Sequence, residues 1–467
     1  MQTPCFAPIA RLSVLALFAC AGTDAALAAP GAPGAPGAPL PRQQPMPMPA
    51  APDITVDVDV GEPMMIAGQE QSAYIKITLG GFALPQQQRP PINLALVLDR
   101  SASMAGDNKL EKAKEAALMV ADRLQPDDII SLVTYDSVVE ILVPATRATA
   151  RDTIREQISA LTPRGSTALF AGVSHGLEEL AKNLNTARVN RMVLLSDGQA
   201  NVGPRSPNEL GRLGEVAARQ GISITTIGLG LGYNEDLMTQ LAVNSDGNHA
   251  FAENAGDLAQ IFQHELGDIL SVVAQDVQID IQFDPGVTPV RAIGRDAAIT
   301  GNKARVSLSQ LYAKQQKHVL FEVKVPPGAA GKKRGLADVA VSYANMVSKQ
   351  KATRRAAAAI EFSAARDAVA ARQNKQVMEA AALAIATDNN RKAVALRDQG
   401  KAQDAERVLQ DNARYLKQEA TRLGSKQLDA YGDRNAADAV QVKGADWGRA
   451  RKTMREDQAK KATQQSW

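Results

Sequence analysis

The sequence predicts a doubly wound α/β domain inserted into a β sandwich and followed by a helical region. Between residues 92 and 272, apolar strand-like runs alternate with amphipathic helical segments, a pattern typical of a parallel sheet covered on both faces. On either side of this block the apolar residues alternate with a period of two, which indicates antiparallel strands. The alanine-rich stretch that follows has helical spacing, and 467 residues suffice for several domains.

The α/β block has a regular order of elements. Apolar strands separated by helices connect through right-handed crossovers, so we expect the strands to lie parallel. Strands are expected at residues 92–98, 128–135, 190–196 and 221–230, and helices at 109–124, 150–161, 168–184 and 207–220.

The β sandwich is expected to take strands from both sides of this block. Two alternating runs lie within residues 53–91, and four more lie within residues 273–350. Two strands alone would leave an apolar face and two open edges in water. We therefore expect residues 53–79 to pair with the strands that follow Val273.

The end of the chain changes character again. Residues 351–432 have apolar side chains at spacings of three and four and predict two or three helices. Residues 433–467 are rich in charge and poor in apolar side chains, so we expect a mobile charged tail there.

The first residues resemble a secretory signal. Residues 1–28 contain Arg11, an apolar segment and small residues before a cleavage point after Ala28. The apolar segment is well short of the roughly 20 residues of a membrane-spanning helix. Residues 29–52 are rich in proline and predict an extended linker. The protein is therefore expected to be exported to the periplasm or the extracellular space.

A lipoprotein alternative ends the signal before Cys20. The stretch Leu17 to Cys20, LFAC, resembles a bacterial lipoprotein processing site, and an acylated Cys20 would attach the chain to a membrane by its lipid alone. Cleavage after Ala28 would instead remove both cysteines, Cys5 and Cys20. A chain without thiols has no disulfides, cysteine nucleophiles or thiolate metal sites. Both alternatives remain open.

The charge balance argues against nucleic acid as a partner. The formal net charge is +3 over 467 residues, and basic and aromatic residues do not cluster in the sequence. We expect no nucleic-acid binding.

Oxygen-bearing side chains follow the ends of predicted parallel strands. The first strand runs directly into Asp99, Ser101 and Ser103, Thr167 lies in a later loop, and Asp197 follows the third strand. Ligands of such sheets collect outside the carboxyl ends of the strands. Carboxylates and hydroxyls without histidine or cysteine suit hard cations, Mg²⁺ above all, with Ca²⁺ or Mn²⁺ as alternatives.

The spacing of these residues resembles a known motif. Asp99-Arg100-Ser101-Ala102-Ser103, then Thr167, then Asp197 looks like the metal-ion-dependent adhesion site of von Willebrand factor type A domains. The resemblance covers about residues 92–272, and the flanking layout is similar to bacterial secreted members and to inter-alpha-trypsin inhibitor heavy chains. It implies cation-dependent binding of a protein ligand that supplies an Asp or Glu to the metal.

Arg100 departs from the usual pattern of that motif, where many members carry a smaller or neutral residue. We expect it to place a positive charge beside the ion and to alter which partners are accepted. The alternative for the strand-end residues is a turn with local side-chain caps, and Thr167 could cap the following helix.

An enzymatic function is not expected. A Gly-x-Ser-x-Gly string occurs at residues 172–176, but it lies inside the predicted helix 168–184 rather than at a strand-to-helix elbow, and no histidine stands near Ser101 in the pattern. We predict an exported, cation-dependent protein-binding module for adhesion or assembly. The alternatives are a scaffold of the cell envelope that does not use the metal, or a metal-assisted hydrolase. The four histidines are His175, His249, His264 and His318.

Export predicts that the mature chain lacks its first residues. Mass spectrometry of the amino terminus distinguishes the two processing alternatives: a chain that begins at an acylated Cys20 establishes the lipid anchor, and one that begins at an unmodified Ala29 eliminates it. A mature chain that keeps Met1 contradicts both.

Overall fold

The computed structural model describes residues 52–84 and 88–467. The predicted signal, the lipidation candidate Cys20 and residues 29–51 of the predicted linker lie outside them. Among the helices of the described residues, none is both long and apolar enough to cross a bilayer.

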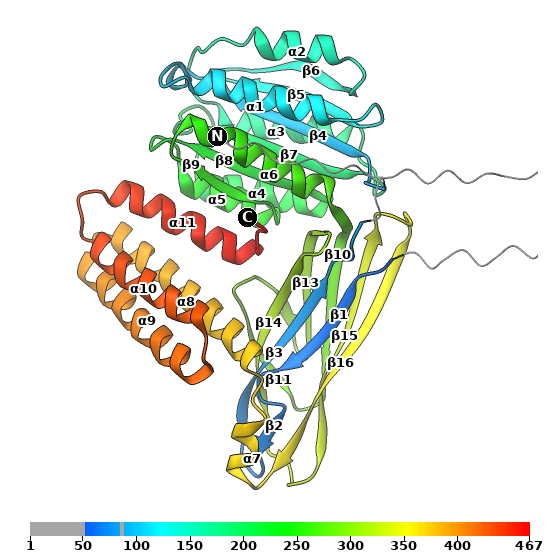
Figure 1. Cartoon of the computed structure of the whole chain (residues 1–467), viewed down its shortest axis with the longest axis vertical. Helices are drawn as coiled ribbons and strands as arrows, with labels where there is room; N and C mark the ends of the chain where they lie inside the picture. Colours follow the sequence, from blue (N-terminus) through cyan, green and yellow to red (C-terminus); the bar gives the residue numbers. More distant parts are fainter. Residues whose placement is uncertain (1–51, 85–87) are drawn as a thin grey trace, which may run out of the picture. The chain divides into compact units, whose positions relative to one another are not determined.

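A six-stranded sheet forms the centre of the α/β domain (Figure 1), with the strand order β6-β5-β4-β7-β8-β9. β6 runs antiparallel to β5 and the other neighbours are parallel. The predicted doubly wound α/β fold is confirmed. The strands are β4 (Ile92–Asp99), β5 (Ile129–Tyr135), β6 (Val139–Arg147), β7 (Val189–Ser196), β8 (Ile222–Leu229) and β9 (His249–Ala252).

Strand β6 was not among the predicted strands. It lies at the edge of the sheet, is largely half-exposed, and contains Pro144. An edge strand tolerates proline because one side of it needs no ladder hydrogen bonds, but the same proline weakens the strand signal in the sequence.

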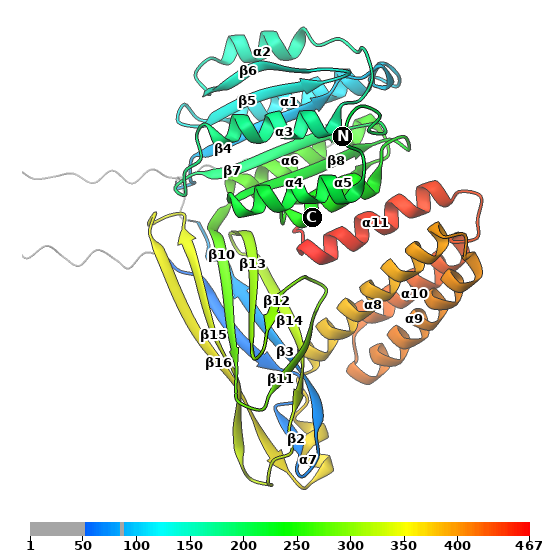
Figure 2. The ribbon, with the colours of Figure 1, turned by 180° about the vertical axis from the view of Figure 1, so that it is seen from behind.

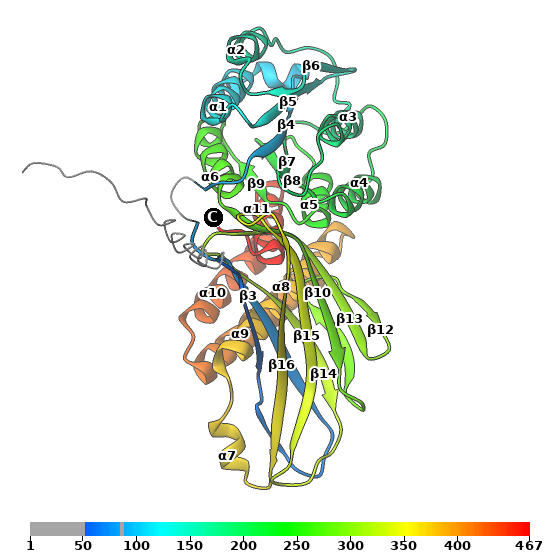
Figure 3. The ribbon, with the colours of Figure 1, turned by 90° about the vertical axis from the view of Figure 1, so that its right-hand side faces the viewer.

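Helices cover both faces of this sheet, as Figure 3 shows. Leu94, Leu96 and Leu98 of β4 pack with α1, α2 and α6, whereas Ala95 and Val97 pack with α3, α4 and α5. The alternation of side chains along β4 thus supplies two apolar faces. The helices are α1 (Lys109–Arg123), α2 (Arg151–Ser159), α3 (Leu169–Ala181), α4 (Pro207–Arg219), α5 (Glu235–Asn244) and α6 (Leu258–Leu270).

The remaining strands form two further sheets with a common apolar core. One sheet has the order β1-β3-β14-β11 and the other β12-β13-β10-β15-β16-β2, whose long strands are seen in Figure 2. The strands are β1 (Thr55–Val60), β2 (Met64–Ile66), β3 (Gln71–Gly80), β10 (Val272–Phe283), β11 (Thr288–Ile293), β12 (Ala298–Thr300), β13 (Lys303–Tyr312), β14 (Gln316–Val325), β15 (Lys333–Asn345) and β16 (Lys351–Ser363).

Strand β3 pairs antiparallel with β14 along its whole length, with Ile77 opposite Val319. Strands from before and after the α/β domain therefore share one sheet. The apolar side chains of β3, Ile75 and Ile77 among them, meet Ile279 and Ile281 of β10 in the core between the two sheets.

The predicted helical region begins with a strand, so the prediction of helix from residue 351 was wrong at its start. β16 pairs with β15 from Lys351 to Glu361. Its alternate residues Ala358, Ile360 and Phe362 are buried. Alanine has high helix propensity, but a partner strand offering a full ladder and a buried face outweighs that preference.

The prediction of a mobile tail at residues 433–467 was also wrong. This stretch contains the end of α10 and a further helix, α11, and several of its side chains are buried. The helices after the sandwich are α7 (Arg366–Ala371), α8 (Lys375–Asp398), α9 (Ala402–Leu423), α10 (Lys426–Gln441) and α11 (Trp447–Thr463).

Two charged side chains of α11, Arg451 and Lys452, are paired with the α/β domain rather than solvated. Lys452 Nζ donates to the Tyr233 carbonyl oxygen at 2.7 Å, lies 4.2 Å from the centre of the Tyr233 ring and forms an ion pair with Glu235. Arg451 Nη2 lies 2.5 Å from Asp236 Oδ2. These partners are distant in the sequence, so the charge of the segment does not reveal that it folds.

The end of the chain also covers the edge strand β9. The Phe251 amide donates to Glu456 Oε1 and the His249 amide donates to Gln465 Oε1, each at 3.2 Å. An open sheet edge with free amides is a template for unwanted pairing. These two side chains therefore protect the edge of the α/β sheet.

A buried carboxylate joins the α/β domain to the sandwich. Asp246 lies 2.7 Å from Arg295 Nη1 and 3.2 Å from Lys317 Nζ, and it accepts from the Ser309 amide at 2.8 Å. Burial raises the pKa of Asp246, but the two cations outweigh burial and hold this pKa below its ordinary value. The carboxylate is therefore charged in the folded protein.

Asp246→Ala is expected to lower the free energy of unfolding by about 3–5 kcal/mol, because it removes the carboxylate that pairs with the buried Lys317 and the partly buried Arg295. Urea denaturation at pH 7 measures this. The control is Asp280→Ala, which removes an exposed pair with Arg305 and should cost at most about 1 kcal/mol. Equal effects of the two variants would contradict the assignment.

The contacts of Asp246 with Arg295 and Lys317 also predict that stability depends on pH. Because the folded pKa of Asp246 lies below its unfolded value, its stabilisation is complete above about pH 5 and is lost as the pH falls through the folded pKa. The stability difference between wild type and Asp246→Asn should therefore shrink on acidification below about pH 4.

The covered edge of β9 can be tested by amide hydrogen exchange. Glu456→Ala should speed exchange at Phe251 by about fivefold, the equivalent of one hydrogen bond, and leave His249 unchanged. Gln465→Ala should do the reverse, so each variant is the control of the other. Uniform acceleration at both amides would indicate general loosening instead.

Candidate metal site at the strand ends

Three loops meet at the carboxyl end of the α/β sheet. One follows β4, one precedes α3, and one follows β7. Backbone hydrogen bonds tie the first two together: the Arg164 amide donates to the Arg100 carbonyl at 2.7 Å and the Ala102 amide to the Gly165 carbonyl at 3.0 Å. The second and third are tied by the Thr167 amide, which donates to Asn201 Oδ1 at 2.7 Å.

The structure places four of the predicted ligands in one hydrogen-bonded chain. Asp99 Oδ1 accepts from the Ser101 amide at 2.8 Å. The Ser101 and Ser103 hydroxyl oxygens lie 3.0 Å apart, and Ser103 Oγ donates to Asp197 Oδ1 at 2.6 Å. The two serines therefore connect Asp99 and Asp197, which stand at the ends of separate strands.

Gly198 brings the fifth residue, Thr167, into the group. A side-chain carbon at position 198 would lie 3.2 Å from Thr167 Oγ1 and 3.5 Å from Ser103 Oγ. The absence of a side chain therefore lets this loop pass between the two hydroxyls. Gly165 and Gly203, with φ of 70° and 77°, are turn residues in the same loops.

The two carboxylates are buried, with exposed fractions of 0% for Asp99 and 1% for Asp197. Burial raises the pKa of Asp99 to about 6, against the lowering effect of hydrogen bonds from Ser101 and Ser196. A buried carboxylate that neighbours a second one needs compensating positive charge.

Three contributors to the site were not found in the sequence. Ser196, the last residue of β7, donates to Asp99 Oδ2 at 2.8 Å, and Asn201 orients the Thr167 loop. Lys109, the first residue of α1, lies with its Nζ 2.8 Å from Asp197 Oδ2. Two features of the sequence could have indicated them: Ser196 stands next to Asp197, and Lys109 stands at the start of a predicted helix.

Arg100 does not add a free positive charge to the site, so that expectation was wrong. Its side chain is buried, with Nε 2.9 Å from Asp136 Oδ2 and Nη2 2.8 Å from Glu140 Oε2. Arg164 pairs with the same two carboxylates. Burial raises the pKa of Asp136, but the two guanidinium groups hold it below its ordinary value. The four charges neutralise one another beside the site.

The donor set fits a hard divalent cation. Carboxylate and hydroxyl oxygens are the ligands that Mg²⁺ prefers, with waters in the remaining positions. Within residues 52–84 and 88–467, no three or more His, Cys, Asp or Glu side chains are grouped to hold a metal. A cation here would therefore depend on the hydroxyls of Ser101, Ser103 and Thr167 as well as on the two carboxylates.

The histidines lie on other parts of the described structure. His175 is in α3, His249 in β9, His264 in α6 and His318 in β14. Burial, followed by Lys460 and Lys452, lowers the pKa of His249 to about 3, so its ring is neutral at physiological pH. His249 forms hydrogen bonds with Thr226, Tyr233 and Gln465 rather than with the strand-end residues.

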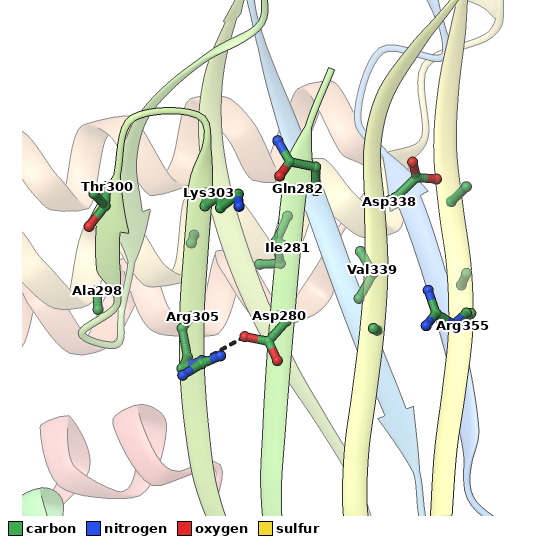
Figure 4. A pocket seen from close by; sticks show the side chains of 14 residues that line it. Asp280, Ile281, Gln282, Ala298, Thr300, Lys303, Arg305, Asp338, Val339 and Arg355 are labelled. Atoms are coloured by element: carbon green, nitrogen blue, oxygen red, sulfur yellow. Dashed lines mark hydrogen bonds and ion pairs between the residues drawn. The ribbon is translucent and has the colours of Figure 1, made fainter. Parts of the chain in front are cut away.

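A separate groove of about 940 Å³ lies on the six-stranded sheet of the sandwich (Figure 4). It is lined by charged side chains and by small ones such as Ala298 and Ala340. Arg305 and Asp280 within it pair with each other at 2.6 Å. Its chemistry gives no reason to place a reaction or a cation there.

Comparison with known proteins finds likenesses to the α/β domain. The family model of the von Willebrand factor type A domain matches residues 93–264. The structure of a von Willebrand factor type A protein from Catenulispora acidiphila superimposes with a TM-score of 0.65 at 15% identity, over 81% of this chain and 89% of that one. The ArnB paralog VWA2 from Sulfolobus acidocaldarius gives 0.57 at 17% identity, over 87% and 98%. These likenesses show the fold.

Curated relatives match over part of the chain. The uncharacterized protein YfbK of Escherichia coli K12 is 28% identical over 48% of this chain and 40% of its own length. The uncharacterized protein sll0103 of Synechocystis is 29% identical over 49% and 52%, and the human inter-alpha-trypsin inhibitor heavy chain H3 is 28% identical over 43% and 23%. The chain spans about half or less of the length of these relatives.

Arg100→Met is expected to destabilise the protein by about 2–3 kcal/mol, because it strips the buried Asp136 of one charged partner. Arg164→Met removes the half-exposed partner of the same carboxylates and should cost about 1 kcal/mol or less. Thermal unfolding followed by circular dichroism measures both. A larger loss of stability for Arg164→Met than for Arg100→Met would contradict the conclusion that Arg100 is the more buried partner.

Proposed function

We propose that the chain is an exported protein-binding module whose partner binds through a divalent cation, with Mg²⁺ as the first candidate, because the family model of the von Willebrand factor type A domain matches residues 93–264. Asp99, Ser101, Ser103, Thr167 and Asp197 hold the ion.

The observation that carries this proposal is the convergence of five oxygen-bearing side chains from three loops. Ser103 is central, because its hydroxyl contacts both Ser101 and Asp197, and Gly198 leaves room for Thr167 beside it. Structural turns alone would not require two buried aspartates at the ends of neighbouring strands. A cation would relieve the repulsion between their charges.

Each residue has a distinct part in holding the ion. The hydroxyls of Ser101, Ser103 and Thr167 act as direct neutral ligands, and Asp99 and Asp197 supply negative charge either directly or through water. Because three of these ligands are neutral hydroxyls, few anionic oxygens reach the ion directly. It attracts an Asp or Glu side chain of a partner protein, which completes its coordination.

The proposal includes the location of the protein. The signal-like residues 1–28 support export to the periplasm or the extracellular space, and Cys20 supports attachment by a lipid anchor as an alternative to a free chain. Adhesion or assembly in the cell envelope fits both cases.

Isothermal titration of the full mature chain with Mg²⁺ tests the ion site. We expect one site in the wild type and at least about a tenfold loss of affinity in Ser103→Ala and Asp197→Ala, because each removes a ligand or its charge. The matched control is Ser166→Ala, a hydroxyl deletion beside Thr167 in the same loop. If Asp197→Ala binds the ion as well as the wild type does, the assignment is wrong.

Affinity capture from envelope extract tests the partner. Wild type with Mg²⁺ should retain a protein that is lost both on chelation and in Ser103→Ala, while Ser166→Ala keeps it. Recovery that is the same in all four samples supports a metal-independent scaffold instead. Release of a hydrolysed product only in the presence of Mg²⁺ would support a metal-assisted hydrolase.

A further inference from the structure

The ammonium group of Lys109 lies inside the charged centre of the candidate metal site. Its Nζ is 2.8 Å from Asp197 Oδ2, while the other oxygen of Asp197 accepts from Ser103. The Lys109 side chain is 19% exposed and that of Asp197 is 0% exposed. A pair this well shielded is screened less by salt than a surface pair is.

The position of Lys109 is unusual for a lysine. It is the first residue of α1, where the helix dipole disfavours a positive charge. Asp107 and Asn108, which precede it, both adopt left-handed backbone conformations, with φ of 54° and 55°. Such conformations are uncommon outside glycine, although Asp and Asn tolerate them best. The local structure thus accepts two unfavourable features where Lys109 reaches Asp197.

The formal charges of the site show what Lys109 changes. Asp99 and Asp197 contribute two negative charges and Lys109 one positive charge, which leaves a net charge of −1 at neutral pH. The neighbouring pairs of Arg100 and Arg164 with Asp136 and Glu140 sum to zero. A divalent cation brings the site to +1, and a single carboxylate from outside then brings it to zero.

The same count without Lys109 gives a different result. The two carboxylates alone carry −2, so a divalent cation neutralises them completely. An added carboxylate would then make the site negative in a buried environment, which is unfavourable. Lys109 therefore weakens the binding of the ion in the absence of a partner. It also leaves the ion-bound site with a positive charge that an anionic group can neutralise.

We propose that Lys109 makes cation binding at this site depend on a carboxylate supplied by the partner. This inference rests on the proposed cation site and adds a specificity-determining residue to it. The ammonium keeps the site from holding the ion tightly alone, so that ion and anionic partner group bind cooperatively. By linkage, the carboxylate raises the affinity for the ion as much as the ion raises the affinity for the carboxylate.

The test compares Mg²⁺ affinity with and without a simple carboxylate. The wild type and Lys109→Met are titrated by calorimetry in chloride and in acetate at equal ionic strength and pH 8. Acetate should tighten Mg²⁺ binding to the wild type by about tenfold. Lys109→Met should bind Mg²⁺ about tenfold more tightly than the wild type already in chloride, and acetate should change its affinity by less than about twofold.

Lys112→Met is the matched control, because it removes the same charge from the same helix. Lys112 is 42% exposed and pairs with Glu115, so this variant should behave as the wild type does. Lys109→Arg keeps the charge and should keep the acetate dependence. Thermal unfolding of each variant checks that the domain is intact.

The outcomes separate this inference from the proposed function. Equal Mg²⁺ affinity and equal acetate dependence in the wild type and Lys109→Met overturn the role of Lys109 and leave the ion site standing. Failure of all four proteins to bind Mg²⁺ overturns the ion site and with it this inference. Tighter binding by both Lys109→Met and Lys112→Met assigns the effect to overall charge and also overturns it.

Discussion

The direction of two neighbouring strands is the constraint on which the site depends. β4 and β7 are parallel and adjacent, with Leu98 opposite Leu195, so both end at the same edge of the sheet. β4 ends with the buried Asp99, and the buried Asp197 directly follows β7. The fold therefore forces two carboxylates together in a place that water reaches poorly, where repulsion is strong. The surrounding hydroxyls and the Lys109 ammonium are arranged around that charge.

The carboxyl-end loops also link this site to the end of the chain. Gln199, two residues beyond Asp197, donates to the Gly232 carbonyl at 2.7 Å, and the next residue, Tyr233, accepts from Lys452 of α11. A side-chain carbon on Gly232 would lie 2.8 Å from the Asp197 carbonyl oxygen, so the contact is close. One short loop thus touches both the site and the last helix. α11, which the sequence suggested was part of a solvated tail, therefore contacts a loop that lies against the site.

Local patterns in the sequence were sufficient for the α/β domain and for bringing the five predicted side chains to one edge. Apolar strands such as residues 92–98 are buried on both faces and have no other plausible environment. Strand ends in a parallel sheet coincide, so residues that follow them must lie near one another. Both inferences need only the order of elements along the chain.

What the sequence could not supply depends on partners far away in the chain. The alanines of β16 form a strand because β15 lies beside them. Arg451 and Lys452 of α11 are largely shielded from water because Tyr233, Glu235 and Asp236 pair with them. Arg100 also depends on distant partners. Its place next to Asp99 in the sequence suggests a positive charge at the site, but Asp136 and Glu140 neutralise that charge. Lys109 is the converse case, because nothing near it in the sequence indicates its buried partner, Asp197, which lies 88 residues away. The effect of a charge on a site is set by which partner neutralises it, and only the folded chain determines that partner.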